Sequence, residues 1–260
     1  MALMAAAGEI EPMPKAAVFA DTQAEPQSVY RWLDWLESKL PFPVVRVTAG
    51  SLTEATLSLK TNRKTGRSYY SNMIPAFVAN ADGTQGRVPR HCTYNYKIVP
   101  LTKACRQLGN IKRGQKDIGV VQWIGISLDE SQRMKPSREP WCKHRWPLIE
   151  RRMTRQKCLD WMKSHGYPQP PRSACVYCPF HSFAEWRRLQ LTEPDGFAEA
   201  VRVEHELQRL HANVSANGKI NGTPYLHKSC KPLDAVDFRS DAERGQSLLW
   251  MDECEGVCGV

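Results

Sequence analysis

Hydrophobic positions in the first part of the chain alternate between short strand-like runs and helical stripes. Residues 1–7 have a helix-like pattern, and the apolar run at 15–20 predicts a strand. At 27–39 the apolar side chains recur on one helical face, and 44–47 predicts the next strand after two prolines. This strand–helix–strand rhythm indicates an α/β fold in which helices cover a parallel sheet.

A polar stretch from residue 50 to residue 90 interrupts this rhythm. It contains KTNRKTGRSYY at 60–70 and ADGTQGR at 81–87. We interpret it as an excursion or lid over a ligand site, not as a linker between domains. Its basic residues, with Tyr69 and Tyr70, suit nucleic acid, although a solvated loop is the simpler explanation.

The second half continues with further helices and one strong strand. The expected elements are a helix at 97–108, a strand at 120–127, a helix at 154–165 and a helical region at 183–211 that is broken near 194–196. Thr154 is placed to cap the helix at 154–165, and Gly166 follows its end. We therefore expect a nucleotide-binding-like α/β domain over 1–170 and a Cys-rich region over 171–260 packed on the same domain.

The composition restricts the class of protein. With 42% hydrophobic residues among 260 and a mean hydropathy of -0.50, the chain has enough apolar residues for a core but no membrane-length apolar run. The first eight residues are apolar, but the stretch is short and lacks a basic segment, so we do not interpret it as a signal peptide. We expect a cytoplasmic protein without a membrane partner. The chain has 36 Lys and Arg residues against 27 Asp and Glu residues. This excess of positive charge favours an anionic ligand, namely a nucleotide, sulfate, phosphate or nucleic acid. A generally basic surface explains the same excess.

Cysteines are the strongest chemical signal. There are nine, in a chain without a secretion signal, so metal binding or catalysis is more expected than disulfides. Cys175 and Cys178 form a C-x-x-C followed by Pro179, with His181 nearby. Such a turn presents two thiolates to one ion or cluster. The alternative is a buried pair of small apolar thiols.

Two further groups surround other cysteines. Cys92 follows Arg90 and His91, a positive neighbourhood that favours the thiolate. Arg90 and Lys97 are suited to clamp a sulfate or phosphate. An ordinary loop and basic helix start explain the same residues. At the C-terminus, Cys254 and Cys258 lie on a glycine-containing tail that can supply cluster ligands or a mobile nucleophile.

The remaining candidates are single residues. Cys230 is a further possible ligand, whereas Cys105 and Cys158 fall within helical patterns and are expected in the core. Asp21 with Thr22, and Asp129, follow predicted strands, where ligands bind in open parallel sheets. Helix capping explains each aspartate almost as well.

Taken in order, several motifs resemble one family. These are Phe19-Ala20-Asp21-Thr22, Arg90-His91-Cys92-Thr93 with Lys97 and Pro100, Trp146-Pro147-Leu148-Ile149 with Thr154-Arg155, and Cys175-x-x-Cys178-Pro179. They resemble the phosphoadenosine phosphosulfate reductase-like group of the PP-loop, or adenine nucleotide alpha hydrolase-like, superfamily. The tail from Glu253 to Gly259 is similar to versions carried by bacteriophages and prophages.

The resemblance implies a doubly wound parallel sheet with an adenine nucleotide across its carboxyl edge. It also implies that Cys254 is the nucleophile that attacks an adenylylated sulfate, with a thiol reductant such as thioredoxin, and that Arg90 and Lys97 meet the anionic end. Asp21, Thr22 and Asp129 would lie near the nucleotide. A [4Fe–4S] cluster, or alternatively zinc, would be held by Cys92, Cys175, Cys178 and Cys258, with His91, Cys230 or Cys254 as other candidates for the fourth ligand.

The start of the chain departs from the family pattern. The family opens with a strand and a Ser-Gly-Gly-x-x-Ser type loop that cradles phosphate, and no such loop precedes or follows MALMAAAGEIEP here. We expect that the chain as written is truncated at its start and lacks this cradle.

Three functions remain open at this point. The first is thiol attack on an adenylylated sulfate with release of sulfite. The second is ATP-dependent sulfur insertion into tRNA or DNA, with the basic segment at 60–70 meeting the nucleic acid. The third is a non-catalytic module in which zinc staples the fold and the basic surface binds nucleic acid or a partner.

Overall fold

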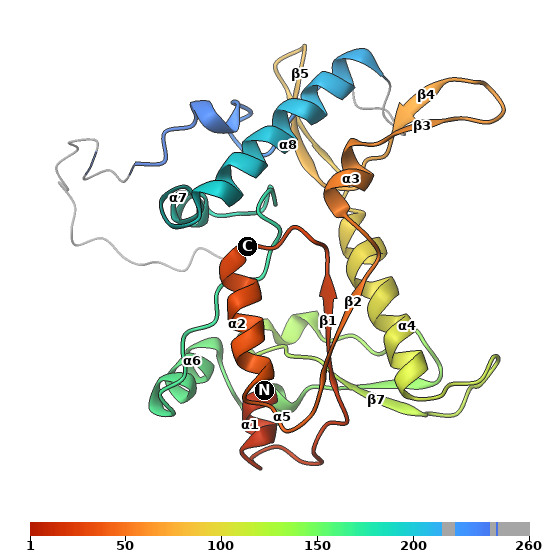
Figure 1. Cartoon of the computed structure of the whole chain (residues 1–260), viewed down its shortest axis with the longest axis vertical. Coiled ribbons are helices and arrows are strands. Elements are labelled where there is room, and N and C mark those ends of the chain that lie inside the picture. The colour runs from red at the N-terminus through yellow and green to blue at the C-terminus, as the bar shows by residue number, and fades with distance from the viewer. Residues whose placement is uncertain (215–221, 240–242, 244–260) are drawn as a thin grey trace.

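The computed structural model describes residues 1–214, 222–239 and 243, and shows a mixed α/β chain (Figure 1). Its helices are α1 (Ala2–Ala6), α2 (Gln27–Glu37), α3 (Leu52–Leu57), η1 (Thr93–Ile98), α4 (Val99–Leu108), η2 (Leu128–Arg133), α5 (Pro147–Glu150), α6 (Arg155–Ser164), α7 (Phe183–Thr192), α8 (Pro194–Asn213) and η3 (Leu233–Ala235). Its strands are β1 (Ala17–Asp21), β2 (Val44–Thr48), β3 (Leu59–Thr61), β4 (Ser68–Tyr70), β5 (Ala76–Asn80), β6 (Gln85–Val88), β7 (Val120–Trp123), β8 (Cys142–Arg145) and β9 (Gly222–Tyr225).

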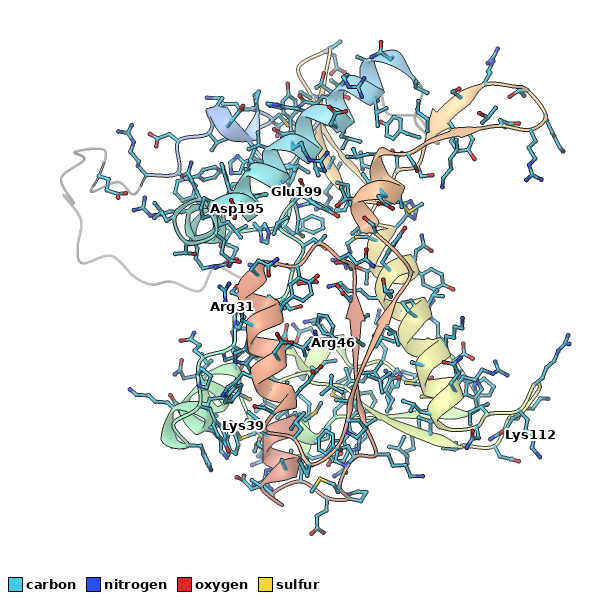
Figure 2. All side chains as sticks on the ribbon, in the orientation of Figure 1. Arg31, Lys39, Arg46, Lys112, Asp195 and Glu199 are labelled. Atoms are coloured by element: carbon cyan, nitrogen blue, oxygen red, sulfur yellow. The ribbon has the colours of Figure 1, made fainter. Side chains whose placement is uncertain are left out.

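The predicted strand–helix–strand unit at the start is present. β1 and β2 are parallel, and α2 connects them. Arg46 of β2, labelled in Figure 2, forms ion pairs with Asp34 and Glu37 of α2, and these tie the helix to the strand. Helix α4 packs against both strands. The register that places Ala17 opposite Val44 ends at Asp21 opposite Thr48, so both strands finish at one edge.

A second parallel pair, β7 and β8, also lies against α4. Gly109, at the C-terminal end of this helix, permits the close approach, since a Cβ there would lie 2.3 Å from Val120 Cγ2. Cys105, Ile111, Trp141 and Cys142 form the small core between helix and strands. This confirms Cys105 as a core residue and adds Cys142 to the same core.

The two parallel pairs are separate in their hydrogen bonding. Within the described residues, β1 pairs with β2 and β7 pairs with β8, while other strands form small antiparallel sheets. The predicted α/β class is therefore confirmed, but one continuous doubly wound sheet is not. The structure shows several small sheets around shared helices instead.

The polar segment at 50–90 has more regular structure than the sequence predicted. It contains α3, a hairpin of β3 and β4 that extends away from the rest of the molecule, and the antiparallel pair β5–β6 (Figure 1). β9, from much later in the chain, completes the sheet by pairing with β5. The segment is thus largely a set of short antiparallel strands.

The largest core joins both halves of the chain. Trp186, Leu189 and Val203 of α7 and α8 are fully buried together with Leu52 and Tyr70 from the first half. The Cys175-Val176-Tyr177 segment is part of the same core. Burial of this much apolar surface is the main stabilising contribution to the fold.

The helix boundaries agree with their capping signals. Thr154 Oγ1 accepts a hydrogen bond from Lys157 N at 3.2 Å, and Gly166 has a positive φ of 65° just beyond α6, as predicted. The predicted break between α7 and α8 falls at Glu193. None of the helices in the described ranges is both long enough and apolar enough to cross a membrane.

Candidate functional site

The C-x-x-C segment lies beside the end of β1. Thr22, immediately after β1, is fully buried, and its Oγ1 is 3.2 Å from Cys175 Sγ. Val176 N donates to Ala24 O at 2.8 Å, so the two segments are joined by backbone as well as side chain. The structure therefore brings Cys175 to the carboxyl end of a parallel strand, where ligands bind in α/β folds.

The C-x-x-C itself is a tight turn. Cys178 N donates to Cys175 O at 2.9 Å, and His181 N donates to Cys178 O at 3.1 Å. The His181 ring also faces this turn, with Nε2 2.9 Å from Cys175 O. These hydrogen bonds hold the backbone of both cysteines in place, and His181 contributes to the turn through its backbone N–H and its ring.

Cys92 joins this pair from another part of the chain. It packs against the large core that contains Cys175. Burial raises the pKa of the Cys178 thiol, and a charge on the neighbouring Cys92 raises it further. Cys92 therefore lies near enough to Cys178 for its charge to matter there, on the same core as Cys175.

Lys97 is held at the same site by a buried carboxylate. Its Nζ lies 3.0 Å from Glu25 Oε1, and Ser173 Oγ donates to Glu25 Oε2 at 3.1 Å. Burial lowers the pKa of Lys97, but Glu25, Cys175 and Cys178 together raise it above its ordinary value. Lys97 is therefore a charged ammonium facing the two thiols. It is carried by the π-helical turn η1, which packs against β1.

The ionisation predicted for Cys92 is wrong. Burial raises the pKa of this thiol, and Arg90 and Lys97, which lower it, offset only part of the effect. Burial also raises the pKa of Cys175, to about 12. At neutral pH these groups are thiols, and a bound metal ion or a comparable positive charge is needed to make them thiolates.

Three arginines gather around Phe180, two residues after Cys178. The guanidinium carbons of Arg87 and Arg90 lie 5.8 and 5.7 Å from the centre of the Phe180 ring, and Arg172 Nη2 donates to Phe180 O at 3.1 Å. Arg172 also lowers the pKa of Cys178, against the larger effect of burial, so its charge is felt at this thiol. Each of the three arginines contacts a different part of Phe180, and guanidinium groups are the side chains best suited to bind a sulfate or phosphate group.

Only Arg90 of these three was predicted. Arg87 ends the polar ADGTQGR stretch and Arg172 follows the proline-rich turn, so the two lie far apart in the sequence. Each of them contacts Phe180 in the folded chain. Neither the spacing of residues nor the hydrophobic periodicity of the sequence predicts these contacts.

The predicted aspartates have structural partners. Asp21 Oδ1 accepts hydrogen bonds from Tyr30 Oη at 2.8 Å and Gln23 N at 2.7 Å, next to the cysteine site. Asp129 Oδ2 accepts one from Arg155 N at 2.6 Å, at the start of α6. Asp21 caps no helix and instead fixes the turn that follows β1, whereas Asp129 reaches the first backbone N–H of α6, whose N-cap is Thr154.

The other candidate ligands are less informative. Cys254 and Cys258 lie outside the described residues. Cys230 follows β9 with a positive φ of 50°, and its N donates to His227 O at 3.0 Å. His91 is exposed, and its carbonyl accepts a hydrogen bond from Asn95 N.

The donors suit a metal site, but the described residues do not complete one. Three thiols match the preference of iron–sulfur clusters and zinc for sulfur ligands. Nevertheless, across 1–214, 222–239 and 243, no group of three or more His, Cys, Asp or Glu is arranged to hold a metal ion. Cys92, Cys175 and Cys178 belong to or pack on one core, but in the described residues they do not form a closed site.

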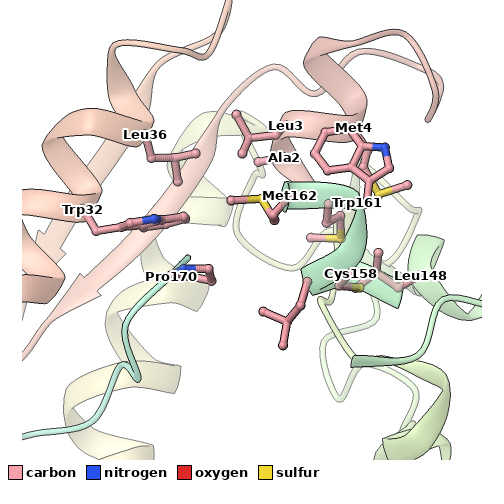
Figure 3. A pocket seen from close by; sticks show the side chains of 12 residues that line it. Ala2, Leu3, Met4, Trp32, Leu36, Leu148, Cys158, Trp161, Met162 and Pro170 are labelled. Carbon is pink, nitrogen blue, oxygen red and sulfur yellow. The ribbon is translucent and has the colours of Figure 1, made fainter. Parts of the chain in front are cut away.

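A separate cavity of about 190 Å³ lies between α1, α2 and α6 (Figure 3). Apolar side chains dominate its lining, among them Leu3, Trp32, Leu36 and Trp161, and Cys158 contributes a thiol. None of the three site cysteines lines it. Because it lacks converging polar groups, we assign it no role in the chemistry.

Comparison of the chain with protein-family models, with curated proteins and with solved structures found no match.

Proposed function

We propose that this chain is a phosphoadenosine phosphosulfate reductase-like enzyme, in which thiol attack on an adenylylated sulfate releases sulfite. The observation that supports it is the gathering of Cys92, Cys175 and Cys178 beside Lys97 and the arginines around Phe180, at the end of β1. In this proposal, the two parallel strand pairs that pack on α4 are parts of one doubly wound arrangement of the adenine nucleotide alpha hydrolase-like type.

The described residues would bind and orient the substrate. Arg90, with Arg87 and Arg172, would hold the sulfate or phosphate oxygens through charge-assisted hydrogen bonds. Lys97, kept in place by Glu25, would contribute a fixed positive charge next to Cys175. The adenine nucleotide would lie along the strand ends near Thr22.

The proposed reaction uses Cys254, outside the described residues, as the nucleophile. Its thiolate attacks the sulfate sulfur, an S–S bond forms, and the S–O bond to the nucleotide phosphate breaks. One thiolate of a dithiol reductant such as thioredoxin then attacks the cysteine sulfur, and sulfite leaves with the electron pair. The second thiolate of the reductant breaks the mixed disulfide so formed and frees Cys254. The reductant ends as a disulfide, so two electrons from two thiols reduce sulfur(VI) to sulfur(IV).

Cys92, Cys175 and Cys178 would hold a [4Fe–4S] cluster with a fourth ligand such as Cys258. When bound, the cluster would supply electron-transfer chemistry and keep the three thiols deprotonated. The protein without it keeps these groups protonated, as their raised pKa values indicate.

The test is an assay of anaerobically purified full chain with phosphoadenosine phosphosulfate and reduced thioredoxin. We expect a brown protein that releases sulfite, with iron content lost in Cys175→Ser and Cys178→Ser. Cys105→Ser, which changes a core thiol away from the site, is the matched control and should keep its iron. Arg172→Gln should raise KM about tenfold or more, because it removes one charge-assisted contact with the anion.

Other products would favour the other functions. Thiolated nucleic acid, formed with AMP and pyrophosphate from ATP, would replace this proposal with sulfur insertion. A colourless protein that binds zinc and releases no sulfite would replace it with a non-catalytic module.

A further inference from the structure

We propose that the β3–β4 hairpin is an arm that binds the phosphate backbone of nucleic acid, a property beyond the proposed reaction. The hairpin pairs Lys60 with Tyr69 and Thr61 with Ser68, and it extends from the molecule as a two-stranded ribbon (Figure 1). A ribbon of this kind has the dimensions that the major groove of DNA admits.

Positive charge is concentrated on this ribbon. Lys60, Arg63, Lys64 and Arg67 occur within eight residues, and no acidic residue occurs between Glu54 and Asp82. Every residue from 59 to 68 is exposed. Within the part of the chain that the structure describes, none of these four side chains forms an ion pair, unlike many arginines on the helices.

The ribbon has a defined shape although it is exposed. Asn62 Oδ1 accepts hydrogen bonds from Lys64 N at 2.9 Å and Thr65 N at 3.1 Å, and Asn62 N donates to Arg67 O at 2.9 Å. Gly66 takes the left-handed φ of 67° that this turn requires. The cations are therefore presented on an ordered turn, which lowers the entropic cost of binding.

The base of the ribbon is anchored in the core. Tyr70 is fully buried, and its Oη lies 2.9 Å from His211 Nδ1 on α8. Tyr70 is thus unavailable for stacking on a base, contrary to the sequence hypothesis, whereas Tyr69 lies opposite Lys60 and is only partly covered. Charge, with Tyr69 as a single aromatic contact, predicts binding without sequence specificity.

The experiment measures binding of the full chain to a fluorescent DNA duplex about 20 base pairs long, by anisotropy over a range of salt concentrations. The test variant is Arg63→Gln/Lys64→Gln/Arg67→Gln. The matched control is Lys112→Gln/Arg113→Gln/Lys116→Gln, which also removes three positive charges, from an exposed loop at the opposite end of the long axis (Figure 2). Both triples change exposed side chains, so both should melt at the temperature of the unchanged chain.

We expect the hairpin triple to weaken binding roughly tenfold or more at low salt, and to reduce the slope of log K against log salt by about 3. The control should leave affinity within about twofold, since only the general charge changes. Equal losses in the two triples would overturn the proposal, as would absence of DNA binding at low salt. Binding of the unchanged chain to phosphatidylserine vesicles but not to DNA would also overturn it.

These measurements need neither cofactor nor turnover. The same assay on Cys175→Ser should give unchanged DNA affinity, so failure of the reductase proposal and failure of this one are separate results.

Discussion

At the scale of single residues, the candidate site depends on a carboxylate that faces no solvent. Glu25 accepts from Ser173 and pairs with Lys97, and its side chain is 0% exposed. Such a charge is tolerated in a protein interior only when its partners are in place. Lys97, which the sequence analysis assigned to an anionic ligand, is therefore also the cation that stabilises buried Glu25.

We predict that Lys97→Met lowers the free energy of unfolding by about 2 to 3 kcal/mol, because it leaves the Glu25 carboxylate buried without its cation. Urea unfolding at neutral pH measures this loss. Lys103→Met, which changes an exposed lysine on α4, should cost less than about 0.5 kcal/mol. Adding Glu25→Gln to Lys97→Met should restore part of the stability, and a Lys97→Met protein as stable as the unchanged chain would contradict the argument.

The sequence identified much of the site at this scale, but not its electrostatics. Cys92, Cys175 and Cys178 were predicted from motif order, and all three belong to or pack on the same core, although their role as ligands stays a prediction. The thiolate predicted for Cys92 came from its neighbours in sequence, Arg90 and His91, whereas its protonation is set by burial in a core made of distant segments. Arg172 was missed for the same reason, since Phe180 connects it to Arg90 only in three dimensions.

At the scale of elements, α4 positions both parallel strand pairs. It packs against β1, β2 and β7, and Gly109 just beyond its C-terminal end leaves the space that Val120 of β7 occupies. The chain has no strain there, because Gly109 has an ordinary φ of -87°. The requirement is for space beside Val120, not for a special backbone conformation.

We therefore predict that Gly109→Ala destabilises the protein by about 1 to 2 kcal/mol, since the new Cβ would meet Val120 Cγ2 at 2.3 Å. The urea midpoint of unfolding is the measurement. Gly86→Ala, whose Cβ would meet its nearest atoms at 3.8 Å, is the control and should be close to neutral. Val120→Ala removes the clashing methyl, so the double variant should cost less than the sum of the two single variants.

Elements with strong local signals were predicted well. The cap at Thr154, the glycine beyond α6 and the apolar stripe of α2 are encoded within a few residues, and all three are present. The strands between 59 and 88 were interpreted as an excursion because they are short and lie in a largely polar stretch, and apolar β5 is only five residues long. β5 is stabilised by β9, a partner that local sequence does not reveal.

At the scale of the whole molecule, Glu193 joins the two halves of the chain. Its carboxylate accepts hydrogen bonds from Ser28 N at 3.1 Å and Ser28 Oγ at 2.6 Å at the start of α2, and it pairs with Arg188 at 2.7 Å. Burial raises the pKa of Glu193, but these partners together hold it below its ordinary value. The ionised carboxylate thus links α2 to the junction of α7 and α8.

A lowered pKa in the folded state gives a definite sign to the pH dependence. The contribution of Glu193 to stability is present above the ordinary glutamate pKa of about 4.3 and is lost as the pH falls through the lower pKa of the folded state.

We predict that Glu193→Gln is less stable than the unchanged chain at pH 7, and that its stability falls less steeply on acidification. Unfolding free energies measured from pH 7 to pH 3 check this. Glu199→Gln, in an exposed pair with Arg202, should follow the pH profile of the unchanged chain, and an identical profile for Glu193→Gln would contradict the prediction.

The pairing of β5 with β9 has a consequence for synthesis on the ribosome. β5 and β6 emerge early, but the strand that covers the other edge of β5, from Gly222 to Tyr225, emerges only after α8 is complete. Until then the nascent chain exposes a strand edge with the apolar side chains of Ala76, Phe77 and Val78, a template for unwanted pairing. Chains that stop before residue 222 should consequently be more prone to aggregation and to capture by chaperones than the full-length product.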